Sequence, residues 1–216
     1  MEGSKKISSA VIKRLPRYFR YLRSLHEEGV ARISSRELSE RMNITASQIR
    51  QDLNCFGGFG QQGYGYNVEA LYKEIAAILG IDNEINYIII GAGNLGQALA
   101  KYKSFSKRGF RACGVFDIDD NLVGRQIENL TIQHMNTLPE FVANNKVDIA
   151  MLCVPRSATN EVAEEVVQLG IEGIWNFSPT DLRIAQKAVV ENVHLSDSLM
   201  VLGYKLNEFR KNSGRL

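Results

Sequence analysis

A glycine-rich turn restricts the possible fold of this chain more than any other feature. The turn has the sequence Gly91-Ala92-Gly93-Asn94-Leu95-Gly96 and directly follows the apolar, β-branched run Ile85–Ile90. A G-x-G-x-x-G spacing between a buried strand and a helix is typical of dinucleotide-binding folds. Gly91 permits the tight turn, Gly93 lets a pyrophosphate approach the backbone, and Gly96 lets helix and strand pack closely. The N–H groups at the start of the helix then face the phosphates.

A second strand that ends in an acid strengthens this interpretation. The run Arg111–Asp117 places a carboxylate 26 residues after Gly91. A carboxylate at this point accepts hydrogen bonds from a ribose diol and repels a 2′-phosphate, which favours NAD over NADP. Asp119 is a second candidate for the same contact, and Pro155 is a further candidate cofactor-binding residue. Flavin and S-adenosylmethionine fit similar geometry.

The remainder of this half alternates between strand and helix patterns. We predict strands at Ile85–Ile90, Arg111–Asp117, Val147–Val154 and Gly173–Asn176, a weaker strand at Val193–Leu195, and a helix over Thr159–Leu169. Such alternation predicts an α/β fold with a doubly wound parallel sheet, a Rossmann domain over residues 81–195. The segment 196–216 contains a further amphipathic helix over Ser196–Arg210, which must bury its apolar face on its own domain or on a second subunit.

The first part of the chain is basic. Residues 1–78 hold 12 Lys and Arg against 8 Asp and Glu, a charge of +4, whereas the remainder holds 14 against 16, a charge of −2. The first 26 residues hold seven basic groups against Glu2 alone. A basic end suits a polyanion, although a solvated helix face explains the charge equally well.

The same region has the pattern of a helix-turn-helix. We predict a helix that begins near Pro16 and ends at Gly29, since proline is tolerated in a first turn and glycine ends helices. Ser34–Glu37 and Thr45–Gln48 are capping boxes that open two further short helices. Two such helices, joined by a tight polar turn, have the outline of a DNA-reading motif.

The third helix carries side chains that can bond base edges and phosphates. We expect it to present outward Ser47, Gln48, Arg50, Gln51 and Asn54. The glycine-rich segment 57–66 follows with aromatics at hairpin spacing, which favours a β-ribbon wing over a plain loop. Residues 1–80 are therefore predicted to form a winged-helix domain, with Arg14, Arg17 and Tyr64 as additional DNA contacts.

Cysteines and histidines give no metal-ligand spacing. Cys113 and Cys153 lie in apolar strand-like runs and are expected to be buried, inert thiols, while the role of Cys55 stays open. No apolar run is long enough to cross a membrane, and the N-terminus lacks the apolar core of a signal peptide. We expect a cytoplasmic protein without a bound metal.

A dinucleotide-binding fold joined to a helix-turn-helix is compatible with more than one function. A small NAD-dependent oxidoreductase would need a substrate domain, for which the chain has no room, and an acid-base residue. Tyr102, two turns into the predicted glycine-rich helix, has no obvious lysine partner. The other alternative is a DNA-binding protein whose Rossmann fold serves only for dimerisation.

Several motifs together resemble one family. Their order and spacing are similar to the redox-sensing transcriptional repressors called Rex: Lys13-Arg14-Leu15-Pro16-x-Tyr18, Ser34-Ser35-x-Glu37-Leu38, Gln48-Ile49-Arg50-x-Asp52, Gly63-x-Gly65-Tyr66-Asn67-Val68 and the Gly91–Gly96 turn. The resemblance covers nearly the whole chain. One departure is Gln61-Gln62, where the family's wing usually carries Lys or Arg.

The resemblance implies a homodimer that binds operator DNA with NAD+ or without ligand and releases it when NADH binds. It implies that the helix within 196–216 is exchanged between subunits. It also implies a redox-switch network of Arg14, Tyr102 and Asp197, with Tyr102 beside the nicotinamide. A charge-sensitive cluster at that ring can distinguish two ligands that differ in ring charge and shape.

Overall fold

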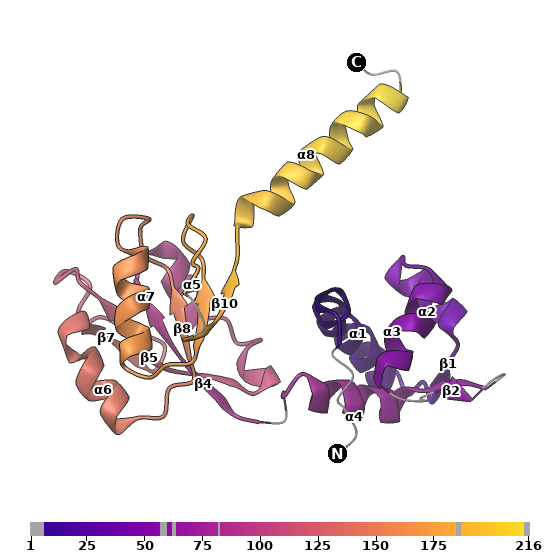
Figure 1. The fold of residues 1–216 in the computed structure, drawn as a ribbon, viewed down its shortest axis with the longest axis horizontal. Coiled ribbons are helices and arrows are strands. Elements are labelled where there is room, and N and C mark those ends of the chain that lie inside the picture. Colours follow the sequence, from indigo (N-terminus) through magenta and orange to yellow (C-terminus); the bar gives the residue numbers. More distant parts are fainter. Residues whose placement is uncertain (1–6, 57–59, 62–63, 82, 185–186, 214–216) are drawn as a thin grey trace. The chain divides into compact units, whose positions relative to one another are not determined.

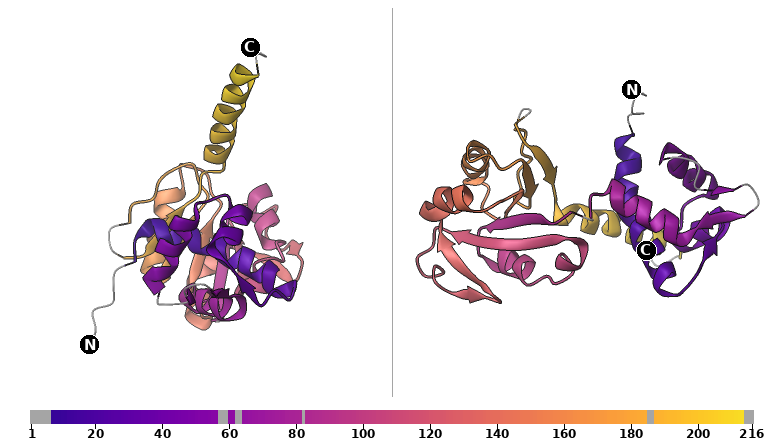
Figure 2. Two further views of the ribbon diagram at one scale, coloured as in Figure 1. Left: turned by 90° about the vertical axis from the view of Figure 1, so that its right-hand side faces the viewer. Right: turned by 90° about the horizontal axis from the view of Figure 1, so that it is seen from below.

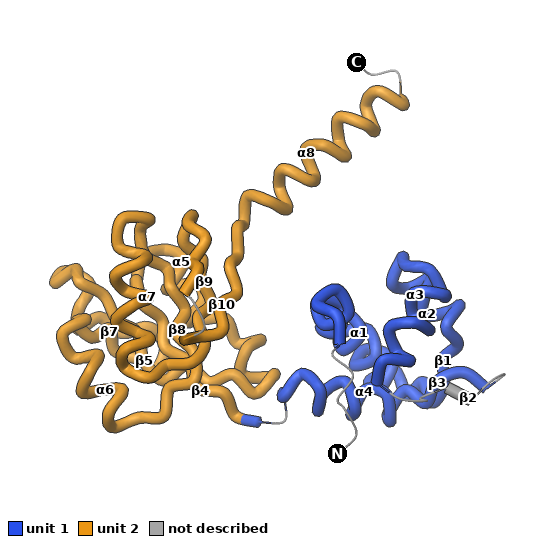
Figure 3. Tube along the Cα trace, in the orientation of Figure 1, with its two compact units in different colours: residues 1–83 blue, residues 84–216 orange. Residues whose placement is uncertain are grey.

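The computed structural model describes residues 7–56, 60–61, 64–81, 83–184 and 187–213. The chain forms two compact units that divide between Asn83 and Glu84 (Figure 3). Each unit has a hydrophobic core of its own. No helix in these residues combines the length and the apolar character needed to cross a membrane.

The first unit is a helical bundle with a small sheet (Figure 1). Its helices and strands are α1 (Ser9–Glu27), β1 (Arg32–Ile33), α2 (Ser35–Met42), α3 (Ala46–Leu53), the 3-10 turn η1 (Asn54–Phe56), β2 (Gly60–Gln61), β3 (Gly65–Asn67) and α4 (Val68–Ile78). The strands form an antiparallel sheet in the order β1-β3-β2. A helix-turn-helix followed by a β-ribbon is the predicted winged-helix architecture. Of the predicted wing, residues 57–59 and 62–63 lie outside the described part of the chain.

Two polar caps start the helices of the helix-turn-helix, but only one is a complete capping box. The Ser34 hydroxyl accepts a hydrogen bond from the Glu37 N–H at 3.1 Å, and the Glu37 carboxylate accepts one from the Ser34 N–H at 2.8 Å. Thr45 likewise accepts from the Gln48 N–H at 3.1 Å. The Gln48 side chain, however, donates to Asp52 at 2.8 Å instead of returning to the cap. The predicted box at Thr45–Gln48 is therefore only half formed.

Helix α1 begins earlier than the sequence predicts. Ser8 caps it, and Pro16 lies inside the helix rather than in its first turn. A proline inside a helix costs about 3 kcal/mol. The turns before it bury Val11 and Leu15, and full burial of such a side chain contributes about 2 kcal/mol. Burial of these two side chains offsets the cost, so the helix extends through the proline.

The second unit is built on a seven-stranded sheet. Its elements are β4 (Ile85–Ile90), α5 (Asn94–Ala100), η2 (Ser106–Arg108), β5 (Phe110–Asp117), β6 (Gln126–Ile127), β7 (Leu130–His134), η3 (Met135–Thr137), α6 (Leu138–Asn144), β8 (Ile149–Leu152), α7 (Thr159–Gln168), β9 (Gly173–Asn176), β10 (Val189–Asn192) and α8 (Leu195–Asn212). The strand order is β10-β9-β8-β4-β5-β7-β6, and each pairing is parallel except that of β6 with β7. The chain therefore winds in opposite directions from β4, which makes the β4–β8 boundary a topological switch point.

Alternate side chains of the central strand face opposite layers. Ile88 and Ile90 pack into the core that includes residues of α6 and α7, whereas Tyr87 and Ile89 pack into the core beside α5. Helices thus lie on both faces of the sheet (Figure 2). This arrangement confirms the predicted doubly wound sheet. The last strand lies at Val189–Asn192 rather than at the predicted 193–195, because the chain turns into α8 directly after His194.

The final helix exposes its apolar side chains. None of the residues of α8 is buried, and the exposed apolar side chains include Leu199, Leu202, Leu206 and Phe209. At its start, the His194 imidazole Nε2 lies 2.8 Å from the Asp181 carboxylate. The helix therefore has the predicted amphipathic face, with no cover from the described residues of its own unit.

Candidate functional site

The three glycines of the Gly91–Gly96 turn have different roles. Gly91 has φ +97°, and an added Cβ would lie 2.5 Å from the Cys153 carbonyl oxygen. A Cβ on Gly96 would lie 1.9 Å from the Gly91 carbonyl oxygen. At Gly93, by contrast, a Cβ would meet no described atom within 4 Å. Packing within the protein therefore requires glycine at two positions, whereas no described atom requires it at Gly93, which is left open to an approaching ligand.

The start of α5 leaves backbone donors near this third glycine. Gly93 is the N-cap of α5, and no described side chain bonds to the first turn of the helix. The N–H groups of Asn94 and Leu95 belong to that turn, and unsatisfied donors at a helix start attract anions. The geometry of the turn therefore fits the phosphates of a dinucleotide.

The predicted ribose-binding acid lies at the turn. One Asp117 oxygen accepts a hydrogen bond from the Ala92 N–H at 2.5 Å, and the other accepts from the Asp119 N–H at 2.9 Å. The Gln97 side chain donates to the Ala92 carbonyl at 2.8 Å. Each carboxylate oxygen has two lone pairs, so Asp117 can still accept bonds from a diol. Asp117 thus fixes the turn as well as offering an acceptor beside it.

The remaining two candidates near the turn follow neighbouring strands. Asp119 is exposed, and the backbone and side-chain N–H groups of Asn121 lower the pKa of its carboxyl. Pro155 follows β8, and its carbonyl accepts a hydrogen bond from the Thr159 hydroxyl at 3.0 Å, which fastens the start of α7. Both residues therefore lie beyond the carboxyl ends of strands next to β4, where ligands of doubly wound sheets bind.

Tyr102 is not at the turn. Helix α5 ends at Ala100, so Tyr102 follows the helix rather than lying within it, and its side chain is 54% exposed. A helix of seven residues spans about 10 Å, which separates Tyr102 from the glycines. It lines an apolar pocket of about 490 Å³ with Met151 and Trp175. The structure of this unit therefore brings Asp117, but not Tyr102, to the Gly91–Gly96 turn.

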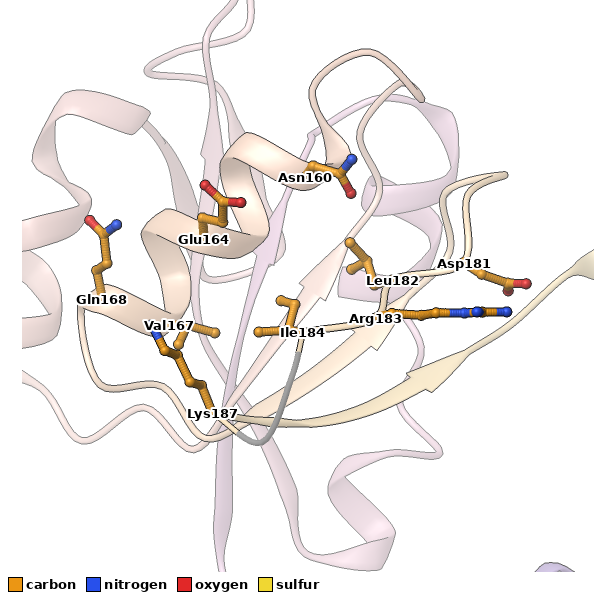
Figure 4. A pocket seen from close by; sticks show the side chains of 9 residues that line it. All are labelled: Asn160, Glu164, Val167, Gln168, Asp181, Leu182, Arg183, Ile184 and Lys187. Carbon is orange, nitrogen blue, oxygen red and sulfur yellow. The ribbon is translucent and has the colours of Figure 1, made fainter.

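A second pocket, of about 630 Å³, lies beside α7 (Figure 4). Its lining includes Asn160 and Glu164 of α7 and Asp181 and Arg183 of the segment before β10. None of the residues predicted for dinucleotide or DNA binding lines it. The larger volume of this pocket therefore does not make it the candidate site.

The polar face of α3 is the candidate nucleic-acid interface. Ser47, Arg50 and Gln51 are exposed on it, and the Arg50 guanidinium donates to the Ser35 hydroxyl at 3.1 Å. On the wing side, Tyr64 is 71% exposed, and the Arg32 guanidinium lies 6.0 Å from its ring centroid. These side chains are available to a duplex, as the sequence predicts.

Three other predicted DNA contacts are engaged within the protein. Arg14 forms a two-bond fork with the Asp52 carboxylate, at 2.6 and 2.7 Å, and Gln48 bonds the same group. The Arg17 guanidinium donates to the Met42 carbonyl at the end of α2, where a cation satisfies a free backbone acceptor. The prediction that Gln48 points freely outward is therefore wrong for this structure, because Asp52 offers it a nearer partner.

Asp52 was not predicted from the sequence as a functional residue. Ile49, Asp52 and Leu53 share the spacing of one helix face, and all three are buried. An acid on an apolar stripe requires a cation or several donors. An acidic residue on the apolar face of α3 was therefore the sequence feature that could have indicated Asp52. The basic helix α1 could have been expected to supply its partner.

The cysteines and histidines form no shared site. Burial raises the pKa of the Cys113 thiol to about 11 and that of Cys153 to about 12, so both thiols are protonated at neutral pH. Cys55 is exposed after α3. Asp197, the remaining member of the predicted redox network, is exposed in the first turn of α8. In the described ranges, no group of three acids, cysteines or histidines is placed to hold a metal.

Family comparisons agree with the division into two units. A family model described as a putative DNA-binding protein N-terminus matches residues 6–54. A second model, described as a CoA binding domain, matches residues 82–180. The first match contains α1 to α3, and the second contains the Gly91–Gly96 turn and most of the sheet.

Full-length relatives and solved structures are more specific. The redox-sensing transcriptional repressor Rex of Thermoanaerobacter pseudethanolicus is 55% identical over 99% of this chain and 97% of that protein. Rex of Clostridium perfringens is 55% identical over 96% and 98%. A crystal structure of RSP with β-NAD+ and operator DNA matches with a TM-score of 0.88 and 55% identity, covering 97% of this chain and 98% of that chain. RSP with β-NADH also matches with a TM-score of 0.88, at 51% identity over 98% and 100%. With this identity over nearly its whole length, the chain belongs to the Rex family of redox-sensing transcriptional repressors.

Proposed function

We propose that this chain represses transcription by binding operator DNA, and that it senses the NADH/NAD+ ratio. It binds DNA with NAD+ or without ligand and dissociates when NADH binds. The observation that carries the proposal is the open space at Gly93, in a chain whose other unit exposes the polar face of α3. As a repressor that acts on DNA, it belongs in the cytoplasm. Its family consists of repressors, so NADH is a signal here and not a reagent.

DNA recognition rests on α3 and the wing. Arg50 can bond guanine and Gln51 can bond adenine in the major groove, since these pairings match donors and acceptors of the base edges. Ser47 and Arg17 contribute phosphate contacts, and Tyr64 of the wing packs against the minor groove. Because the wing has Gln61-Gln62 in place of basic residues, we expect fewer phosphate contacts and a weaker salt dependence.

Ligand binding rests on the Gly91–Gly96 turn. The N–H groups of Asn94 and Leu95 would bond the pyrophosphate that approaches Gly93, and Ala92 would line the turn. Asp117, with Asp119 as an alternative, would accept bonds from the adenosine ribose and reject a 2′-phosphate. Pro155 would border the ligand after β8. The ligand supplies a nicotinamide ring whose charge and shape depend on its oxidation state.

A homodimer provides the partner for α8. The helix exposes Leu199, Leu202, Leu206 and Phe209, and an apolar face of this size is normally covered by another surface. Exchange of α8 between two copies would cover both faces at once. A dimer would also place two α3 helices on successive major grooves, so a change in their separation would control DNA affinity.

The redox-switch network links the two functions. In this proposal Tyr102 lies beside the nicotinamide in the dimer, and Asp197 of the exchanged helix pairs with Tyr102 or with Arg14 according to the ligand. Arg14 keeps 30% of its side chain exposed although it binds Asp52, so its guanidinium can also bind a second carboxylate. The alternative for Arg14 is a simple phosphate contact.

A DNA-binding titration tests the proposal. Fluorescently labelled duplexes that the protein selects from a randomised pool are bound to the dimer and titrated with NAD+ and then with NADH. NADH should release the DNA, commonly with a coupling of about 1–3 kcal/mol, and the DNA should weaken NADH binding by the same factor. Equal DNA affinity in both titrations would refute the sensor function. Steady oxidation of NADH by added carbonyl compounds would instead favour an oxidoreductase.

A further inference from the structure

A fully buried carboxylate joins α1 to α3. Asp52 accepts four hydrogen bonds: from Arg14 Nε at 2.6 Å, Arg14 Nη2 at 2.7 Å, the Tyr18 hydroxyl at 2.9 Å and Gln48 Nε2 at 2.8 Å. Burial alone would raise the pKa of this carboxyl. The bonds from Arg14, Gln48 and Tyr18 outweigh that effect and hold the pKa below its ordinary value. Asp52 is therefore a charged group at neutral pH, even though no part of it reaches solvent.

The four bonds connect one turn of each helix. Arg14 and Tyr18 are one turn apart on α1, and Gln48 and Asp52 are one turn apart on α3. The Asp52 Oδ1 atom accepts from both Arg14 and Gln48, so the two side chains share a single acceptor. A displacement of the Arg14 guanidinium therefore also displaces the Asp52 Oδ1 atom, which accepts the hydrogen bond from Gln48.

The bond to Asp52 restricts a side chain at the edge of the DNA-reading face. Gln48 is half-buried, between the exposed Ser47 and Gln51 side of α3 and the core side at Ile49. A glutamine loses about 1.5–2 kcal/mol of rotamer freedom when it is fixed. If Asp52 fixes the Gln48 rotamer in the free protein, DNA binding does not have to restrict that side chain, and the affinity is higher by the entropy saved.

We propose that Asp52 is a positioning residue that holds Gln48 in its DNA-reading conformation and transmits the position of Arg14 to it. The inference rests on the proposed function, in which Arg14 belongs to the redox network, and on the sequence-based prediction that Gln48 of α3 contacts DNA. The Arg14 Nε and Nη2 atoms face Asp52, and Nη1 remains for another anion. Arg14 can thus bind a second carboxylate without releasing Asp52. If the second carboxylate shifts the Arg14 guanidinium, Asp52 and the Gln48 side chain bonded to it shift as well.

A merely structural Asp52 predicts a different result. A residue that only stabilises the fold would change thermal stability and overall DNA affinity, but not the preference between sequences. A positioning residue changes that preference and acts through Gln48. The decisive quantity is therefore the ratio of the dissociation constants for a random-sequence duplex and for a selected duplex.

The experiment is a double-mutant cycle without dinucleotide. Selected duplexes come from a randomised pool enriched with the wild-type protein, and the reference is a random-sequence duplex of the same length. Loss of one good base contact lowers discrimination by about tenfold. We expect Gln48→Ala and Asp52→Asn each to lower the ratio by about tenfold, and the double variant to lower it no further. The inference would be overturned if Asp52→Asn left the ratio unchanged, or if the double variant lowered the ratio by about a hundredfold.

Arg14→Lys keeps the test decisive if Asp52→Asn does not fold. Lysine preserves the charge beside Asp52 but lacks the fork, so the ratio should fall about threefold because the selected duplex loses more affinity than the random duplex. Arg23→Lys, on the exposed pair with Glu27 of the same helix, is the matched control and should change neither constant. An equal ratio in Arg14→Lys and wild type would also overturn the inference. A wild-type chain that selects no duplex would instead refute the proposed function.

Discussion

Replacing Gly93 and Gly96 separately by alanine distinguishes a ligand-facing glycine from a packing glycine. Gly93 has φ −68° and ψ −171°, an extended conformation open to any residue, and no described atom within 4 Å of its added Cβ. Replacing glycine at such a position stabilises a protein by about 0.4–1 kcal/mol through the unfolded state. At Gly96 the added Cβ would lie 1.9 Å from a backbone oxygen, which no side-chain rotation relieves. We therefore expect Gly93→Ala to fold normally and Gly96→Ala to lose at least about 3 kcal/mol.

The two variants should separate clearly in a thermal melt. In a protein of this size, 1 kcal/mol corresponds to about 2–4 °C in Tm. Gly96→Ala should therefore melt at least about 6–12 °C below wild type, while Gly93→Ala should melt within about 4 °C of it. Trp175, the one tryptophan of the chain, lies on β9 and reports the unfolding of this unit by fluorescence.

Ligand binding should show the opposite pattern for Gly93. A methyl group there moves the phosphates away from the N–H groups of α5, and loss of one bond to a charged group costs about 2 kcal/mol. That cost corresponds to an NADH affinity about 30-fold weaker, measurable by isothermal titration calorimetry. The reasoning is refuted if Gly93→Ala binds NADH as tightly as wild type, or if it is as unstable as Gly96→Ala.

Three further predictions concern the dimer, the DNA-reading helix and acid stability. Leu202→Asp removes burial worth about 2 kcal/mol from each copy, so sedimentation should show a dimer dissociation constant about 1000-fold higher; an unchanged dimer would exclude α8 from the interface. Arg50→Ala should abolish operator binding and leave NADH affinity intact, whereas Arg36→Ala, on the exposed face of α2, should preserve both; loss of NADH binding in Arg50→Ala would indicate misfolding. Because the pKa of Asp52 is lower in the folded state, its contribution to stability is complete above about pH 4 and is lost as pH falls through the folded pKa. Chemical denaturation at pH 7 and pH 3 should show this loss in wild type, and an equal loss in Asp52→Asn would contradict it.

The sequence predicted the sheet well where apolar runs were continuous. The strands Ile85–Ile90 and Gly173–Asn176 begin and end as predicted, because both join isoleucine with an aromatic residue and lie next to glycine or polar residues. Helix α1 was predicted less well, since the preference of Pro16 for a first turn yielded to the burial of residues around it. The β6–β7 hairpin was not predicted, because β6 is only two residues long.

The candidate sites were predictable to the extent that their residues are close in sequence. The different roles of Gly91 and Gly96 follow from spacing within a single turn. The Arg14–Asp52 pair joins residues 38 positions apart, and no local pattern indicates which acid a basic helix faces. Tyr102 was predicted to lie within the glycine-rich helix, but α5 ends at Ala100, two residues before it.

The division between Asn83 and Glu84 gives each unit its own core, and this separation matters for how such a regulator evolves. Substitutions around the Gly91–Gly96 turn can reset the metabolic threshold at which genes are switched on without changing which promoters are recognised. Substitutions on α3 can move the protein to new promoters while the threshold stays the same. One of these two properties can therefore change in evolution while the other, together with every existing operator, stays the same.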